Sequence, residues 1–461
     1  MRHFLAALAV LTVLATGASA QAPEAEDPSE LEEFLDEGLD ELLGGSSSSA
    51  DGDGGSRFSL KGFVELRPRV YLRERNGEKV DEQLLLEAEL EVERTFGGGF
   101  SAYFRPRLFV DLLDDDLHRF EPYEAYVTWE KPSWDLRLGQ MVENWGIVDT
   151  YNPLDLVNRR DFATDILDPR RLGELGVRFR RFFDGRGAFG EPTVSIYALP
   201  VFRETRFSTE NQRFALGSSS LPFDEDGGFE PSGSDRALLA LRLQSTLETA
   251  PLDADLQLIL ARGPERVPTL LVDSGELLPV YYGGRTVGAG LRAVPNEDVL
   301  GSFLASLTLK LEVVHKSPYL FDDSPVEVPD DYVAYVLGFD RAFYNVAKDQ
   351  DQLTLTLEYA GEEGAEDPSA LLRPFRDDLI LRLFWEANDF ARTSLELRGI
   401  YDLETSERLY ELAFATQLRG LHEDLQWSVQ LQVFEPPGTG ESFFDFFPDN
   451  TSLATALRWD F

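Results

Sequence analysis

The residues of this sequence that could do chemistry are charged side chains spaced two positions apart. Side chains with this spacing lie on one face of a β-strand. The runs are Arg67 and Arg69, then Glu87, Glu89, Glu91 and Glu93, then Arg105 and Arg107, and finally Arg178 and Arg180. If these runs are neighbouring strands, opposite charges stand at similar heights and can form ion pairs. Arginines left unpaired would attract anionic solutes; the alternative is that the rows neutralise each other and only stiffen the structure.

The segment from Glu143 to Leu172 combines apolar and charged residues in an unusual way for a loop. Trp145, Tyr151 and Leu154 are too apolar for a loop in water, and a glycine and a proline between them supply turns. Because of these apolar residues, we expect the loop to fold back into the interior of a barrel and to narrow its pore. Mixed charges at that point would create an electric field that orders dipolar solutes. The charged residues that it would display are Asp149, Asp155, Arg159, Arg160 and Asp161. The alternative is a loop that packs outside as a stabilising cap.

The sequence carries no recognisable catalytic or metal-binding arrangement. Beyond residue 20 the histidines are His118, His315 and His422, and none accompanies a nucleophile in a catalytic pattern. Residues 114–116 with His118 could hold a metal ion, but a solvated acidic loop is the simpler interpretation. There is no cysteine, which excludes disulfides and thiolate sites. We expect no enzymatic activity, no cofactor and no bound metal.

From Phe58 onward, the elements that would position these charges have the two-residue period of β-strands. In the clearest run, from Leu84 to Val92, apolar residues alternate with glutamates. We count about eighteen such segments, with sixteen as the alternative if the weak ones near 191–203 and 285–294 are miscounted. The expected fold is all-β: a transmembrane antiparallel up-and-down barrel.

The connections between these segments are expected to alternate between short turns and long loops. The short turns are expected at 97–99, 131–133, 247–251, 387–390 and 420–424, and the long loops near 143–172, 204–234, 263–283, 315–331, 361–375 and 435–450. Five tryptophans map to the short-turn ends and would form an aromatic girdle at a membrane interface. The girdle residues are Trp129, Trp134, Trp385, Trp427 and Trp459, with the terminal Phe461.

The remainder of the chain predicts export and an acidic leader. Residues 1–20 have the charged start, the apolar run and the small-residue cleavage site of a signal peptide. Residues 21–56 contain twelve acidic residues and no basic ones, and 29–43 within them have the spacing of a short amphipathic helix before a flexible tract. This helix would lie in the periplasm or plug the lumen; the alternative is an acidic spacer. The barrel would occupy residues 57–461.

The formal net charge of −40 also restricts the partners of this protein. Nucleic acid is a poor partner for so acidic a chain. Carboxylates on outer loops could instead coordinate divalent cations near lipopolysaccharide; the alternative is acidity for solubility or for life in salty water.

Two parts of the sequence resemble known proteins. The last strand, from Thr451 to Phe461, has one apolar face and a terminal aromatic residue, and it looks like the closing strand of a bacterial outer-membrane β-barrel. The stretch from Arg137 to Gly146, with Asn152-Pro153-Leu154-Asp155 after it, resembles a pattern of large porin-like proteins, including relatives of the alginate-export porins. The alginate-export resemblance implies about eighteen strands and a basic lumen for a polyuronate. The acidity of this chain departs from that pattern.

These observations favour a porin in the bacterial outer membrane that passes small polar or anionic solutes. The alternative is an export barrel for a polysaccharide or lipid that works with periplasmic partners. The expected partners are outer-membrane lipid and lipopolysaccharide, and the barrel-assembly machinery through the C-terminal strand. A homo-oligomer is compatible with these residues.

Overall fold

The computed structural model describes most of the chain after residue 56. The described residues are 57–73, 81–114, 117–163, 165–208, 212–216, 222–224, 228, 230, 231, 233–249, 251–296, 306–321, 328–364, 371, 372, 375–436, 447 and 450–461. The signal peptide expected at 1–20 and the helix expected at 29–43 lie outside these ranges. Within them, the chain is built of strands, turns and short 3-10 helices. No helix in the described part of the chain is long and apolar enough to cross a membrane.

Eighteen strands form one continuous antiparallel sheet in the order of the sequence. They are β1 (Arg57–Tyr71), β2 (Glu82–Phe96), β3 (Phe100–Asp111), β4 (Arg119–Lys131), β5 (Trp134–Met141), β8 (Glu174–Phe182), β9 (Thr193–Leu199), β10 (Leu238–Thr249), β11 (Leu252–Pro264), β14 (Gly283–Pro295), β15 (Leu307–Tyr319), β16 (Tyr332–Tyr344), β17 (Gln352–Glu363), β19 (Asp377–Glu386), β20 (Ser394–Asp402), β21 (Arg408–Gln417), β22 (Leu425–Glu435) and β23 (Ser452–Asp460). The expected count of eighteen is therefore confirmed, and the two weak segments are β9 and β14.

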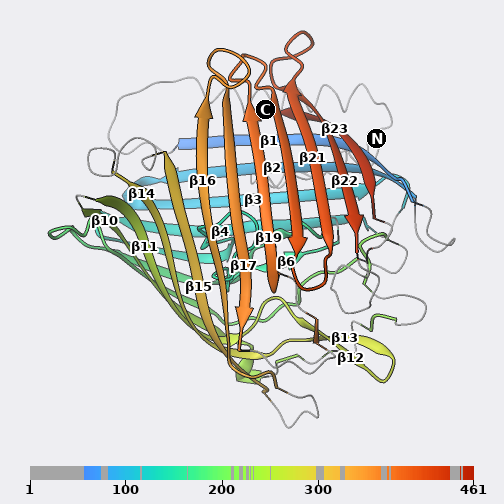
Figure 1. The fold of residues 1–461 in the computed structure, drawn as a ribbon. Helices are drawn as coiled ribbons and strands as arrows, with labels where there is room; N and C mark the ends of the chain where they lie inside the picture. Colours follow the sequence, from blue (N-terminus) through green and yellow to red (C-terminus); the bar gives the residue numbers. More distant parts are fainter. Residues whose placement is uncertain are drawn as a thin grey trace, which may run out of the picture. The chain divides into compact units, whose positions relative to one another are not determined.

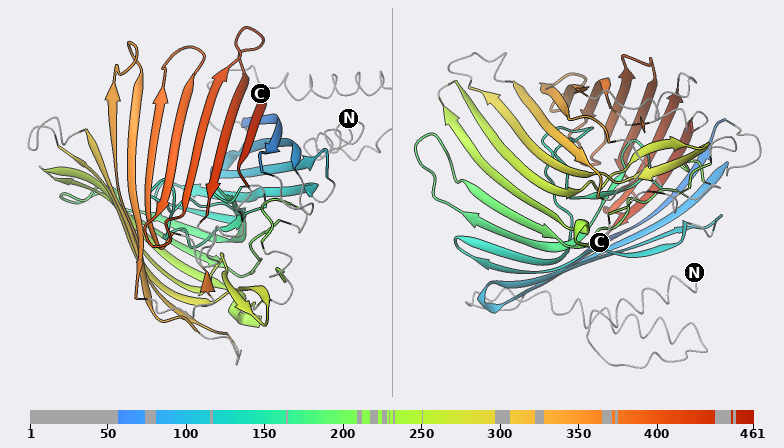
Figure 2. Two further views of the ribbon diagram at one scale, coloured as in Figure 1. Left: turned by 45° about the vertical axis from the view of Figure 1, so that its right-hand side comes forward. Right: turned by 90° about the horizontal axis from the view of Figure 1, so that it is seen from below.

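The sheet closes into a barrel because its first and last strands pair. Val64 on β1 lies opposite Trp459 on β23, and Tyr71 lies opposite Ser452. In Figure 1 the strands β16 to β22 cross steeply over β1 to β4 behind them, as tilted strands on two walls of a barrel do. The right-hand view of Figure 2 shows the wall strands surrounding other segments of the chain. Closure gives each of the eighteen wall strands a partner on both sides.

Short turns gather at one end of the barrel and long loops at the other. The short connections include residues 97–99, 132–133, 345–351 and 418–424, whereas 142–173, 200–237 and 265–282 are long. The five tryptophans expected in a girdle all lie near the short-turn ends of their strands, and Trp129 stacks on Phe100 with ring centroids 5.2 Å apart. Their position at a membrane interface remains a prediction.

The two faces of the strands differ in polarity as the period of two requires. On β11, Leu258 and Leu260 point outward and are exposed, whereas Gln257 and Ile259 point inward and are buried. On β2, Glu87 and Glu89 are buried on the inward side. The barrel therefore has an apolar outside and a charged inside, the arrangement that suits strands surrounded by lipid.

The long loops carry their own small strands and an apolar cluster. Strands β6 (Arg159–Asp161) and β7 (Arg170–Leu172) form a hairpin. Strand β12 (Thr269–Asp273) pairs with β13 (Glu276–Val280) and with β18 (Leu371–Leu372). Loop side chains pack against inward-facing apolar residues of the wall. The cluster includes Val148, Phe162, Phe207, Phe214, Leu277 and Phe447 from loops, with Val336, Ile380, Ile400 and Phe434 from the wall.

Candidate functional site: the constricted lumen

The segment between β5 and β8, residues 142–173, lies within the barrel, and we call it the inward loop. Its backbone N–H groups at Ile147, Val148 and Leu154 all donate hydrogen bonds to the side-chain carboxylate of Glu312 on β15, with distances of 3.2 Å for Val148 and Leu154. The Glu312 side chain is completely buried. Three amide donors replace the hydration that this carboxylate loses on burial, so the loop and the wall stabilise each other.

A second buried wall carboxylate, that of Glu358 on β17, holds the next two residues of the loop. The N–H groups of Asp149 and Thr150 donate to it at 2.8 and 3.1 Å. The side chain of Asp149 forms an ion pair of 2.5 Å with Lys310 on β15, which also pairs with Asp340 on β16 at 2.5 Å. The loop is thus fixed to β15 and β17, which lie far from β5 and β8 in the order of the sheet.

The beginning of the inward loop is anchored by Trp145, which is completely buried. Its indole ring lies edge-on to the ring of Tyr197 on β9 at a centroid distance of 5.0 Å, and its backbone oxygen accepts a hydrogen bond of 2.8 Å from Gln257 on β11. Just before it, Glu143 accepts hydrogen bonds from Arg178 at 2.6 Å and from the Tyr197 hydroxyl at 3.1 Å. The loop therefore follows the inside of the wall across β8, β9 and β11.

Two glycines on β14 make room for this path. A side chain at Gly288 would overlap Leu154, and one at Gly290 would overlap Ile147. Such overlaps are far inside van der Waals contact, so the absence of a Cβ at these positions makes room for the ends of the Leu154 and Ile147 side chains against the wall.

Two cavities lie on opposite sides of the inward loop. The outer cavity, about 190 Å³, reaches the long-loop ends of β11, β14 and β15, and the inner cavity, about 800 Å³, reaches the short-turn ends of β1 and β23. The two share five lining residues, which are Thr150, Asn152, Arg160, Asp168 and Pro169. We call these five residues the constriction.

Charged groups of the loop are held at the constriction by one carboxylate. Asp155 pairs with Arg160 at 2.6 Å and with Arg171 at 2.7 Å, and it also accepts a hydrogen bond from Asn158 at 2.5 Å. Because Arg160 lines both cavities and Arg171 lines the inner one, two guanidinium groups share one carboxylate where the linings of the two cavities meet. Asp168 also lines both cavities, so the formal charges of Arg160, Arg171, Asp155 and Asp168 sum to zero.

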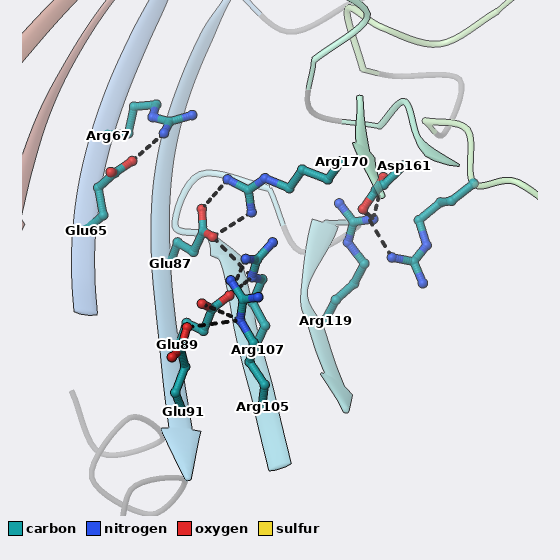
Figure 3. Close-up of polar contacts among 11 residues, drawn as sticks. Glu65, Arg67, Glu87, Glu89, Glu91, Arg105, Arg107, Arg119, Asp161 and Arg170 are labelled. Carbon is teal, nitrogen blue, oxygen red and sulfur yellow. Dashed lines mark hydrogen bonds and ion pairs between the residues drawn. The ribbon is translucent and has the colours of Figure 1, made fainter. Parts of the chain in front are cut away.

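The rows of opposite charge from β1, β2 and β3 line the inner cavity. Figure 3 shows the ion pairs among these side chains. Arg105 pairs with Glu89 at 2.7 Å, and Arg107 approaches both Glu87 and Glu89. Glu87 also accepts two hydrogen bonds from Arg170 of the inward loop, at 2.5 and 2.6 Å. Opposite charges on neighbouring strands thus interact, and one of the wall carboxylates binds the loop as well.

The lining of the inner cavity is nearly neutral although the chain is strongly acidic. Its basic residues are Lys61, Arg67, Arg105, Arg107, Arg160, Arg170, Arg171 and Arg458. Its acidic residues are Glu87, Glu89, Glu91, Asp149, Asp165, Asp168 and Asp460. The formal charge of −40 therefore resides elsewhere on the chain.

Several residues expected in the pore lie away from both cavities. Arg159 pairs with the buried Glu174 at 3.0 Å. Burial lowers the pKa of Arg159, the nearby Arg203 lowers it further, and Glu174 opposes both effects. Asp161 pairs with Arg119 and Arg206, each at 3.2 Å. These groups fix the β6–β7 hairpin to its surroundings and line neither of the two cavities.

The basic residues expected on β1 and β8 divide in the same way. Arg67 lines the inner cavity and pairs with Glu65 at 2.5 Å. Arg69 is buried and lies 5.4 Å from the ring of Phe214. Arg178 and Arg180 both pair with Asp135 on β5, at 3.2 and 2.5 Å. These pairs lie on the wall next to the beginning of the inward loop, where Arg178 also contacts Glu143.

Described residues of the connection between β9 and β10, among them 212–216, also lie in the lumen, which sequence reasoning missed. Gln212 accepts a hydrogen bond of 2.7 Å from Gln83 on β2, and Arg213 is completely buried. The phenylalanines of this loop, Phe207 and Phe214, were the available signal, because they are as apolar as the residues that predicted the inward loop. The anchors Glu312 and Glu358 were also missed, since a single glutamate on a strand carries no local signal.

The histidines that the structure describes, His118, His315 and His422, each make contacts with residues nearby in the fold. His118 Nε2 lies 2.8 Å from the backbone oxygen of Asp111. His315 lies 3.9 Å from Asp331, and His422 lies 3.8 Å from Asp424, in both cases with exposed side chains. Among the described residues, no group of three or more His, Cys, Asp or Glu side chains is arranged to hold a metal ion.

Closure, the apolar outside and the charged lumen define the class of this fold as a closed, eighteen-stranded β-barrel of the membrane-spanning type. Solved structures with a similar fold include OccAB1 of Acinetobacter baumannii (9% identity, 90% of this chain and 98% of that chain, TM-score 0.49) and a BenF-like porin of Pseudomonas fluorescens (10%, 88% and 98%, 0.49). OmpT of Vibrio cholerae, in a trimer form, is also similar (8%, 88% and 100%, 0.39). At these identities the likeness concerns the fold alone. No family model and no curated protein matches the sequence.

Proposed function

We propose that this protein is an outer-membrane channel that passes small polar or anionic solutes through the constriction. The observation that carries the proposal is the pair of cavities on opposite sides of the inward loop, which share Arg160 and four other lining residues. A barrel of eighteen strands is too wide for wall side chains to fill, so a loop must set the width of the path.

The charges at the constriction support a preference for anions. Arg160 and Arg171 share the single carboxylate of Asp155, whereas the rows of β2 and β3 are largely paired with each other. Two guanidinium groups that share one carboxylate can still attract an anion that passes close to them.

The alternative of an export barrel for a polysaccharide or lipid is the weaker candidate. The first part of the inward loop is tied to the wall at Trp145 and, through Glu312 and Glu358, at residues 147 to 154. A polymer would need a wider path, and opening one would break these hydrogen bonds.

Reconstitution of the folded barrel in planar lipid bilayers tests the channel directly. We expect discrete conductance steps and a reversal potential in a salt gradient that favours anions. Folded protein that inserts but stays silent in every preparation would contradict the proposal. A liposome-swelling series with sugars, amino acids and anionic oligosaccharides would then define the range of solutes.

A further inference from the structure

Two arginines stand side by side on the outward face of the barrel. Arg262 on β11 and Arg285 on β14 are register partners, and both are exposed. Directly opposite residues on antiparallel strands have Cβ atoms about 4.5–5.5 Å apart, and like charges at this spacing repel. Neither guanidinium has a carboxylate partner among the described residues. The pair is therefore a local concentration of positive charge.

The pair lies at the border of the apolar surface toward the long-loop end. The next outward pair toward the middle of the same strands is Leu260 and Val287, which are 50% and 56% exposed. The guanidinium of Arg285 lies 5.9 Å from the ring centre of Tyr319 on β15. Tyrosine and the charged ends of long side chains are typical of the level at which lipid tails meet headgroups.

The surroundings of other outward charges on this rim differ from those of the pair. Arg408 on β21 has Glu435 as its register partner. On the strand beside Arg285, Ser317 donates a hydrogen bond of 2.7 Å to Asp331, which also lies 3.9 Å from His315. In a chain with 83 acidic and 43 basic residues, two adjacent arginines without a carboxylate partner are a strong departure from the average surface.

We propose that Arg262 and Arg285 together bind a phosphate group on the headgroup of a glycolipid in the outer leaflet of the membrane. The inference rests on the proposed function, because the membrane orientation puts the long loops and this rim outside the cell. Two guanidinium groups can each donate paired hydrogen bonds to phosphate oxygens, and one phosphate between them removes their repulsion. The lipid tails would then lie along Leu260 and Val287.

The test is binding of diphosphoryl lipid A to the detergent-solubilised barrel. Binding is measured by native mass spectrometry and by competition with phosphate-free lipid A and with inorganic phosphate. The variant is Arg262→Gln with Arg285→Gln. The matched control is Arg392→Gln with Arg419→Gln, which removes two exposed arginines from short turns with the same change of charge. We expect the first double variant to bind about thirtyfold more weakly and the control to bind normally.

Equal binding by the Arg262/Arg285 variant, or equal binding of phosphate-free lipid A to the original protein, would overturn the proposal. Displacement of lipid A by inorganic phosphate alone would also overturn it, because the site would then be a free-anion site. Heat-modifiable migration on a gel establishes that each variant is folded. Conductance of the same preparations separates the lipid-site proposal from the channel proposal. The protein could conduct without binding this lipid, and it could bind the lipid without conducting.

Discussion

The carboxylate of Glu312 accepts a hydrogen bond of 3.2 Å from the backbone N–H of Leu154, a residue 158 positions earlier in the chain. The same carboxylate accepts the N–H groups of Ile147 and Val148, so one wall residue determines the course of the inward loop at three points. Because the loop carries Arg160 and Asp155, the position of the constriction depends on a strand that is not adjacent to it in sequence.

Replacing Glu312 by alanine should release the inward loop and raise the single-channel conductance. Each lost hydrogen bond to a charged group costs about 1.5–3 kcal/mol of local stability. Single-channel recordings in planar bilayers, with limited proteolysis of the loop, measure the effect. Glu396→Ala is the control, since Glu396 faces Arg382 on the wall and has no contact with the loop among those described. Unchanged conductance in a folded Glu312→Ala protein would show that the loop is held by other contacts.

A side chain at Gly288 should displace the loop by direct overlap with Leu154. We expect Gly288→Val to lower stability by about 1–3 kcal/mol, as overpacking does, and to change the conductance. The control is Gly399→Ala on β20, where the nearest contact of an added Cβ is an ordinary 3.6 Å to Tyr410. If both variants conduct like the original protein, the loop does not lie against β14 in the membrane.

Reversing the charge of Arg160 and Arg171 should shift the channel toward cations. The double variant Arg160→Glu with Arg171→Glu leaves Asp155 without a basic partner at the constriction. The reversal potential in a salt gradient should change sign or fall strongly. The control, Arg419→Glu in an exposed turn, should leave it unaltered. An unchanged reversal potential in the double variant would show that this part of the loop does not line the conducting path.

The turn between β16 and β17 should be sensitive to acid through Asp351. Its carboxylate accepts hydrogen bonds from the indole N–H of Trp385 at 2.8 Å and from the N–H groups of Val346, Ala347 and Lys348. Desolvation raises the pKa of Asp351, but these hydrogen bonds outweigh it and hold the pKa below the usual value. Because the pKa is depressed, the ionised carboxylate of Asp351 contributes its full stabilisation of the turn above the ordinary Asp range. That stabilisation is lost as the pH falls through the folded-state pKa.

Tryptophan fluorescence and protease sensitivity of the turn, followed from neutral pH to below about pH 3.9, measure this loss. Asp351→Asn should show the weakened turn already at neutral pH and should have a lower thermal midpoint. Asp349→Asn, in the same turn, is the control. An acid response that is identical in the Asp351→Asn protein would assign the effect to another group.

The strands were predictable because their signal is local. In β2 the alternation of leucine and glutamate allows only one face to meet lipid, whatever the rest of the chain does. The same local reasoning predicted an inward loop from Trp145 and Leu154. It did not separate Arg160, which lines both cavities, from its neighbour Arg159, which pairs with Glu174. Adjacent residues on a strand point in opposite directions, and the direction of a hairpin inside a barrel is set by its contacts.

The sequence by itself determined the class of fold, the number of strands, the alternation of short and long connections and the sign of each row of charge, because period and turn chemistry act between near neighbours. The tertiary structure alone decided which charges meet. It brought Glu312 and Glu358 to the backbone of a distant loop, brought a second loop into the lumen, and put Arg262 beside Arg285. Those contacts depend on barrel closure and strand register, which bring together residues that no local sequence pattern connects.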